Sequence, residues 1–225
     1  MKPKIALHIP VYGREEITPF IQEELRVFLH KSPYDIDVWV THSREYDAKA
    51  WEFDADWLVY ADNFPLGAKF NHAIPEMLKE DYLYIMQMGQ DDVIYPEYWN
   101  YAAKKVQELS PMFGPIKLRV MEWESKMTVD CTFHTVFGAG RMIRMDLIRE
   151  TWEKTGRIWD RDRQSGLDMN SEMNVIMACG LMKKGVTRAR LMGEIEPLVM
   201  DVKTSDNINA FHTLLKFADA TVSQS

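Results

Sequence analysis

The sequence lacks the marks of membrane and secreted proteins. No stretch approaches the roughly 18 uninterrupted apolar residues that a membrane-spanning helix needs, and Pro3 and charged residues come too early for a secretory signal. The only two cysteines, Cys131 and Cys179, have no metal-binding spacing, and without an export signal we expect both to be reduced. We therefore expect a cytoplasmic protein with no stable membrane insertion.

Positive charge is also scarce. The 225 residues carry a net charge of −7, which argues against a general binder of polyanions. Residues 141–190 are an exception, with eleven Lys or Arg and seven Asp or Glu. This excess permits a negatively charged partner such as DNA, and the alternative is ordinary surface charge.

Internal repeats, low-complexity tracts and linkers are absent as well, so we expect one domain over residues 1–225. Apolar runs typical of strands alternate with segments of helical periodicity, which predicts a parallel α/β sheet. In the first half the expected strands are 4–11, 36–42, 56–62 and 82–88, and the expected helices are 15–31, 65–78 (bent at Pro75) and 96–109. In the second half the expected strands are 115–124, 136–144 and 195–202, and the expected helices are 145–152, 167–185 and 205–218.

Polar residues follow several of these strands. Gly13, Asp62 and the adjacent Asp91 and Asp92 all come just past an expected strand end, where parallel α/β sheets bind their ligands. Two neighbouring carboxylates are costly to bury without positive charge, and their oxygen atoms suit Mg²⁺ or Mn²⁺. We expect a divalent cation there, and the alternative is a turn or helix-capping pair before Pro96.

Two segments, ADNFPLGAKFNHAI (61–74) and MGQDDVIYPEYW (88–99), resemble the small GT-A glycosyltransferases of the family 2 type. The likeness covers roughly residues 4–100 and continues more weakly to 212. It implies a GT-A fold, which is a Rossmann-like mixed sheet flanked by helices. Residues 1–110 would form the nucleotide-sugar-binding half and residues 111–225 the acceptor-binding half.

The resemblance also implies a metal-dependent sugar transfer. In this family an acidic motif holds the metal that bridges the diphosphate of the donor. Its leading Asp aligns with Gly89, and its last two align with Asp91 and Asp92. Some GT-A enzymes take a further ligand from a His near the carboxyl terminus, where this chain has His212 within a polar cluster that includes Asp201 and Lys203. The expected cofactor is Mn²⁺ or Mg²⁺.

Donor contacts follow from the same likeness. The loop PVYGRE (10–15) matches the segment that wraps base and ribose, and the stretch before the second helix matches the one over ribose and diphosphate. A UDP-sugar is favoured by the resemblance alone, because Thr41, His42 and Ser43 stand where members often have a base-reading Asp. The alternatives are a Tyr12 that covers the core edge and a solvated Lys69. The expected donor-binding residues are Pro10, Tyr12, Arg14, Asp62, Asn63, Gly67, Lys69, Asn71, Gln90 and Lys203.

For catalysis, the segment GLDMN (166–170) resembles the acidic segment that supplies the family's base. Asp168 is the expected base of an inverting hexosyl or pentosyl transfer, with Glu172 in reserve, and the alternative for Asp168 is a helix cap. Compact members occur in bacteriophages, where some glycosylate hydroxymethylated DNA bases in the host cytoplasm.

Other functions stay open on the sequence. A glycan or lipid-carrier acceptor is equally compatible with it. A sugar-phosphate nucleotidyltransferase would have a glycine-rich first loop, which PVYGRE is not. A non-catalytic nucleotide-sugar-binding protein would be consistent with Gly89 in place of the leading Asp.

Overall fold

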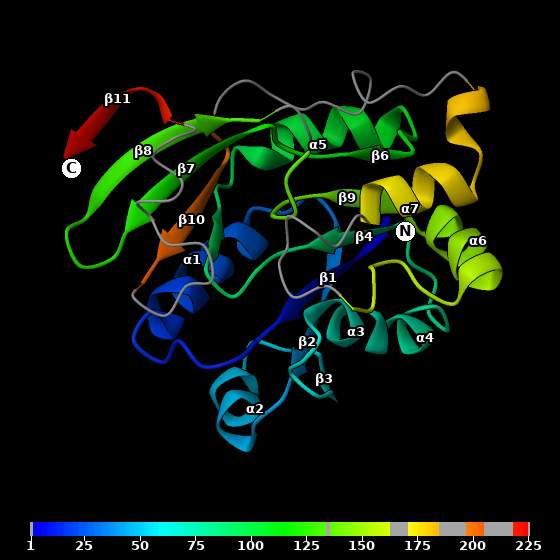
Figure 1. The fold of residues 1–225 in the computed structure, drawn as a ribbon, viewed down its shortest axis with the longest axis horizontal. Helices are drawn as coiled ribbons and strands as arrows, with labels where there is room; N and C mark the ends of the chain where they lie inside the picture. The colour runs from blue at the N-terminus through cyan, green and yellow to red at the C-terminus, as the bar shows by residue number, and fades with distance from the viewer. Residues whose placement is uncertain (1, 134–135, 163–170, 185–196, 205–217, 225) are drawn as a thin grey trace.

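The computed structural model describes residues 2–133, 136–162, 171–184, 197–204 and 218–224 (Figure 1). Its first half alternates strands and helices, as predicted: β1 (Lys4–Pro10), α1 (Thr18–His30), β2 (Asp35–His42), α2 (Glu45–Trp51), β3 (Trp57–Tyr60), α3 (Leu66–His72), α4 (Ile74–Met77), β4 (Tyr84–Gln87), β5 (Asp92–Ile94) and α5 (Tyr98–Gln107). The second half contains β6 (Met112–Phe113), β7 (Lys117–Glu122), β8 (Met127–Thr132), β9 (Met142–Arg144), α6 (Met145–Thr155), α7 (Ser171–Ala178), the 3₁₀ helix η1 (Leu181–Lys184), β10 (Val199–Lys203) and β11 (Ala218–Gln224).

The strands form two sheets. The larger has the order β3-β2-β1-β4-β9-β6, in which β3, β2, β1 and β4 are parallel and β9 runs antiparallel to β4. The smaller has the order β11-β8-β7-β10-β5. Helices flank the larger sheet on both faces (Figure 1). The predicted mixed α/β sheet is therefore confirmed.

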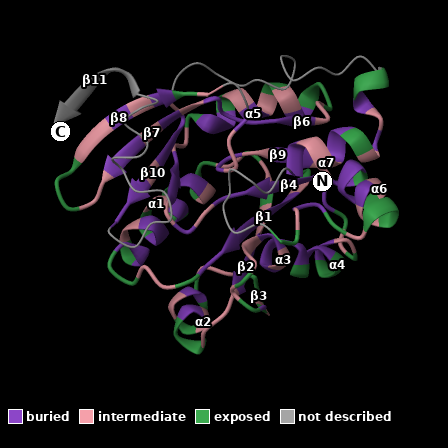
Figure 2. Ribbon diagram, in the orientation of Figure 1, coloured by how far each residue is buried: buried purple, intermediate pink, exposed green. Residues whose placement is uncertain are grey.

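Two apolar clusters hold these layers together, because side chains of a strand alternate between its faces. In β1, Ile5, Leu7 and Ile9 pack with α1, α5 and the smaller sheet. Ala6, between them, belongs to the cluster that includes residues of α3, α4, α6 and α7. Figure 2 shows β1 and β4 as buried ribbons between these layers.

Some elements differ from the expected ones. No helix was expected over residues 43–55, but they contain α2, of which only Asp47 and Trp51 are buried. With so few buried positions this helix has no apolar stripe in the sequence to reveal it. The predicted bend at Pro75 is confirmed, since α3 and α4 are separate helices there. The helix expected over 205–218 lies almost wholly outside the described residues.

The four parallel strands place the segments that follow them along one edge of the larger sheet. β1 ends at Pro10 and β4 at Gln87, and side chains from the next few residues of each strand bond to one another. The predicted meeting of Gly13 with the acidic pair at one rim is therefore confirmed. Among the described residues, no helix has the length and apolarity to span a bilayer.

Candidate active site

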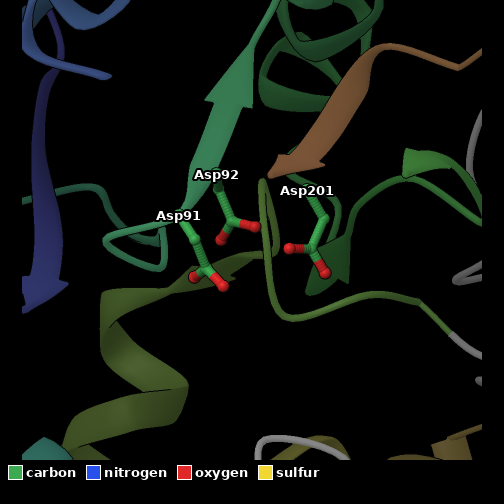
Figure 3. A group of neighbouring side chains, drawn as sticks. All are labelled: Asp91, Asp92 and Asp201. Atoms are coloured by element: carbon green, nitrogen blue, oxygen red, sulfur yellow. The ribbon is translucent and has the colours of Figure 1, made fainter. Parts of the chain in front are cut away.

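Three carboxylates meet at this rim. Asp91 lies in the turn after β4, Asp92 begins β5, and Asp201 lies on β10, where it pairs in register with Asp92 across the antiparallel strands. One oxygen atom of each lies within 4.8 Å of the others. Figure 3 shows the three side chains pointing toward a common space.

A tight turn brings Asp91 and Asp92 into this position. The amide of Asp92 donates to the carbonyl of Gly89 at 3.3 Å, and the amide of Val202 on β10 donates to the carbonyl of Asp91 at 2.7 Å. A Cβ atom on Gly89 would lie 2.6 Å from Oδ2 of Asp92 and 3.0 Å from Oδ1 of Asp91. Position 89 therefore has no room for a side chain while the two carboxylates keep their places.

In each of the three carboxylates, a cationic side chain or a backbone amide of the protein binds the Oδ2 atom. Arg14 pairs with Oδ2 of Asp91, and the amide of Gly89 donates to Oδ2 of Asp92. The ammonium of Lys203 lies 2.6 Å from Oδ2 of Asp201 and 3.5 Å from Oδ2 of Asp91. Three carboxylates and two cations leave the cluster one negative charge in excess when all five groups are ionised.

This charge balance moves the pKa values apart. Burial tends to raise the pKa of Asp91, but Lys203 and Arg14 overcome it and hold that pKa well below its usual range. Burial and the charges of Asp91 and Asp201 raise the pKa of Asp92 well above its usual value. For Asp201, burial raises the pKa to about 6 against the attraction of Lys203. The cluster therefore lacks the positive charge that would keep all three acids ionised.

The donor set fits a hard divalent cation. Three carboxylates that present oxygen atoms to one space are the ligands that Mg²⁺ and Mn²⁺ prefer. Oδ1 of Asp201 is buried and has no hydrogen-bond partner within the described part of the chain. The expected cation thus has a fitting site, although Arg14 and Lys203 supply part of the positive charge that the sequence led us to assign to a metal alone.

Hydrogen bonds join the loop after β1 to the acidic turn. The side chain of Gln90 accepts from the amide of Tyr12 at 2.6 Å and donates to the carbonyl of Gly13. Gly13 and Arg14 both have left-handed backbones, with φ of 69° and 60°. Asp47 accepts from the amide of Gly13 at 3.1 Å, so α2 supports the same loop. Gln90 therefore orders the expected donor loop from within the protein.

Tyr12 lies close to Lys69, another expected donor-binding residue, and to Arg44. Tyr12 is 48% exposed, with the Arg44 guanidinium 5.0 Å and the Lys69 ammonium 5.7 Å from the centroid of its ring. Lys69 is buried, not solvated, and its ammonium donates to the carbonyl of Val11 and, at 3.2 Å, to Oδ1 of Asn63. An exposed aromatic ring close to two cations can stack on a base.

Asn71 has a structural task. Its Nδ2 donates to the carbonyls of Gly67 and Trp159, each at 2.7 Å, and its Oδ1 accepts from the amides of Ile158 and Trp159. These four bonds use the whole amide. Asn71 therefore connects α3 to the loop after α6, and none of its polar atoms is left to bind a nucleotide sugar.

The other predicted residues fall in different places. Pro10 is the buried last residue of β1, and Asp62 is exposed just past β3. Glu172 is buried on α7. Asp168 and His212 lie outside the described residues.

Sequence reasoning gave no role to Asp201 or to Asp47. Asp201 stands far from the acidic pair in sequence and joins it only through the β5–β10 register. The sequence feature that could have revealed Asp201 is a single carboxylate in an apolar strand, two residues before a lysine. Asp47 lay in a segment in which no helix was expected.

Comparison with known proteins identifies the fold. A scan against protein-family models finds no match, and no curated protein matches the sequence. Among solved structures, S. aureus TarS 1–349 matches with a TM-score of 0.57 at 13% identity, over 88% of this chain and 60% of that one. The same TarS fragment in complex with UDP gives a TM-score of 0.53 at 12% identity, over 89% and 60%.

The mannosyltransferase PcManGT from Pyrobaculum calidifontis, in complex with GDP-Man and Mn²⁺, gives a TM-score of 0.51 at 17% identity, over 90% of this chain and 57% of that one. The chain thus spans about 60% of the length of these proteins. At such identities the likeness establishes the fold, which is the expected GT-A arrangement.

Lys69 provides a prediction about pH. Burial lowers its pKa from 10.5 to about 8; Asp47 opposes this shift and Arg44 adds to it. Between these pH values the unfolded chain holds more protons than the folded one, so stability should rise with pH through this window. As the pH rises from about 8 to 10.5, the free energy of unfolding of the unaltered protein should increase by about 3 kcal/mol relative to that of Lys69→Met.

Urea unfolding of both proteins between pH 7 and 10.5 measures this gain, because pH effects of other groups cancel in the difference. A difference that does not vary with pH would contradict the buried, depressed state of Lys69.

Proposed function

We propose that this chain, which has the GT-A fold, transfers a sugar from a nucleotide sugar to an acceptor hydroxyl with the help of a divalent cation. The observation that carries the proposal is the rim where Asp91 and Asp92 meet the loop of Tyr12 and Arg14. This rim lies beyond the carboxyl ends of the parallel strands, where ligands of such sheets bind.

The charges of the rim support a donor with a diphosphate. With all groups ionised, the cluster keeps one negative charge in excess, and it would repel a diphosphate. A bound dication would reverse this excess and stabilise the departing diphosphate as a Lewis acid. Asp91 and Asp92 would hold the cation. The structure of PcManGT in complex with GDP-Man and Mn²⁺ supports this pairing of nucleotide sugar and metal in the same fold.

The nucleotide would lie along the loop after β1. The exposed ring of Tyr12 offers a stacking face for the base, and Lys69, itself bonded to Asn63, holds the loop through the carbonyl of Val11. Arg14 and Lys203 are held by carboxylates, so they would act on the diphosphate from beside the cation. The TarS fragment with UDP supports a uracil nucleotide as one donor to test.

The acceptor hydroxyl needs a base to take its proton, and inversion needs that base on the face opposite the departing diphosphate. We assign this role to Asp168, which comes just before α7, and keep Glu172 on that helix as the reserve. A sugar-phosphate nucleotidyltransferase would instead release pyrophosphate, so the product separates the two activities.

DNA as the acceptor was inferred from the basic excess of residues 141–190. Several of these side chains are engaged within the protein: Arg144 with Asp146, Lys154 with Glu150, and Arg149 with the carbonyl of Leu78. The described basic residues thus add no support for DNA. We propose an acceptor hydroxyl and leave its class to a panel of hydroxymethylated DNA, lipid-linked and glycan acceptors.

The donor site provides one prediction. Asp91→Ala should weaken Mn²⁺-dependent binding of the nucleotide sugar at least about tenfold, because it removes a ligand of the cation. Thermal shift with a panel of nucleotide sugars first identifies the donor, and calorimetry then measures its affinity with and without Mn²⁺. The matched control is Asp130→Ala, which removes a β8 carboxylate paired with Arg119. Equal donor affinity in Asp91→Ala and the unaltered protein would contradict the proposal.

The catalytic base provides a second prediction. Asp168→Asn should lower the rate of nucleoside-diphosphate release with acceptor present by a factor of about 10² or more, because the hydroxyl proton loses its acceptor. Donor affinity should stay unchanged, since Asp168 is assigned to the other substrate. Unchanged turnover in this variant, with turnover lost in Glu172→Gln, would move the role to Glu172.

A further inference from the structure

We infer that Asp201 on β10 completes the cation site with Asp91 and Asp92, and that Lys203 is the built-in counter-charge that limits the cation affinity of this site. The inference rests on the proposed function, because it concerns the same cation. It assigns a ligand that the acidic turn itself does not contain.

The backbone register places Asp201 at the site. Asp201 is the Cα partner of Asp92 in the antiparallel pairing of β10 with β5. The amide of Val202 also bonds to the carbonyl of Asp91 at 2.7 Å. Because these bonds tie β10 to both acidic residues of the turn, the Asp201 carboxylate is fixed beside theirs, as Figure 3 shows.

The two oxygen atoms of Asp201 have different surroundings. Oδ2 is held by the Lys203 ammonium at 2.6 Å. Oδ1 is buried and has no hydrogen-bond partner among the described residues. A buried carboxylate oxygen without a partner is costly, and a cation between the three carboxylates would satisfy it. In this arrangement Lys203 orients Asp201, a ligand of the cation, without binding the cation itself, as the neighbours of metal ligands commonly do.

The turn cannot supply a third carboxylate of its own at position 89. A Cβ atom there would lie 2.6 Å from Oδ2 of Asp92, the oxygen that already accepts the Gly89 amide. Any side chain at this position would push Asp92 out of place. A third carboxylate therefore has to come from another element, and β10 is the strand next to β5.

Lys203 opposes the cation that Asp201 attracts. Its ammonium lies within 3.5 Å of both Asp91 and Asp201, and its side chain is only 7% exposed. A positive charge so close to the cation and poorly screened by solvent must weaken cation binding.

The test uses Mn²⁺ alone, without donor or turnover. Titration of the full chain with Mn²⁺, followed by the electron paramagnetic resonance signal of the free ion, gives the dissociation constant directly. Asp201→Asn keeps the shape of the side chain and should raise this constant at least about tenfold. The matched control, Asp130→Asn on β8, should leave it unchanged, since Asp130 pairs with Arg119 away from the cluster.

Lys203→Met should act in the opposite direction and lower the dissociation constant several-fold. It is also the deciding variant if Asp201→Asn does not fold. Unchanged or weaker Mn²⁺ binding in Lys203→Met would overturn the role of Lys203. Unchanged binding in Asp201→Asn, with binding lost in Asp91→Ala, would overturn the role of Asp201 and leave the proposed function intact. An unaltered chain that binds no Mn²⁺ would instead overturn the metal-dependent function itself.

Discussion

The structure depends on how three carboxylates, one buried and two half-buried, are kept together at the edge of a sheet. Asp91, Asp92 and Asp201 have oxygen atoms within 4.8 Å of one another, and their mutual repulsion would drive them apart without positive charge. Arg14 and Lys203 provide two of the charges needed. The remainder, one negative charge, is what a proton on Asp92 or a bound dication has to balance. We propose that a dication fills this role, with the diphosphate of a nucleotide-sugar donor as its counterpart.

Each part of the fold contributes one constraint to this arrangement. The parallel strands β1 and β4 bring the loop of Arg14 beside the acidic turn, and Gln90 bonds the loop and turn together. The turn is tight because residue 89 has no side chain. The smaller sheet contributes β10, which holds Asp201 and Lys203 in register with β5. The site therefore lies where the two sheets meet.

The sequence revealed most of the first half because its signals are local. Apolar runs predicted β1, β2 and β4, and Pro75 marked the break between α3 and α4. Gly13 and the acidic pair follow strand ends, so the parallel sheet itself predicted their meeting. Asp201 was not predicted, because its place depends on a strand pairing between distant segments. The partners of Arg14 and Lys203 were also missed: both were expected to bind the donor, and both hold carboxylates, which only three-dimensional proximity discloses. Asn71 shows the converse, since its family-like position conceals a structural task.

The central claim is that one dication balances all three carboxylates. The most direct measurement is anomalous X-ray diffraction at the manganese edge, from crystals of the full chain grown with Mn²⁺ and a nucleoside diphosphate. We expect a single strong anomalous peak at coordination distance from Asp91, Asp92 and Asp201, with the diphosphate as a further ligand. A peak bound elsewhere, or a diphosphate held by Arg14 and Lys203 with no ion at the carboxylates, would contradict it.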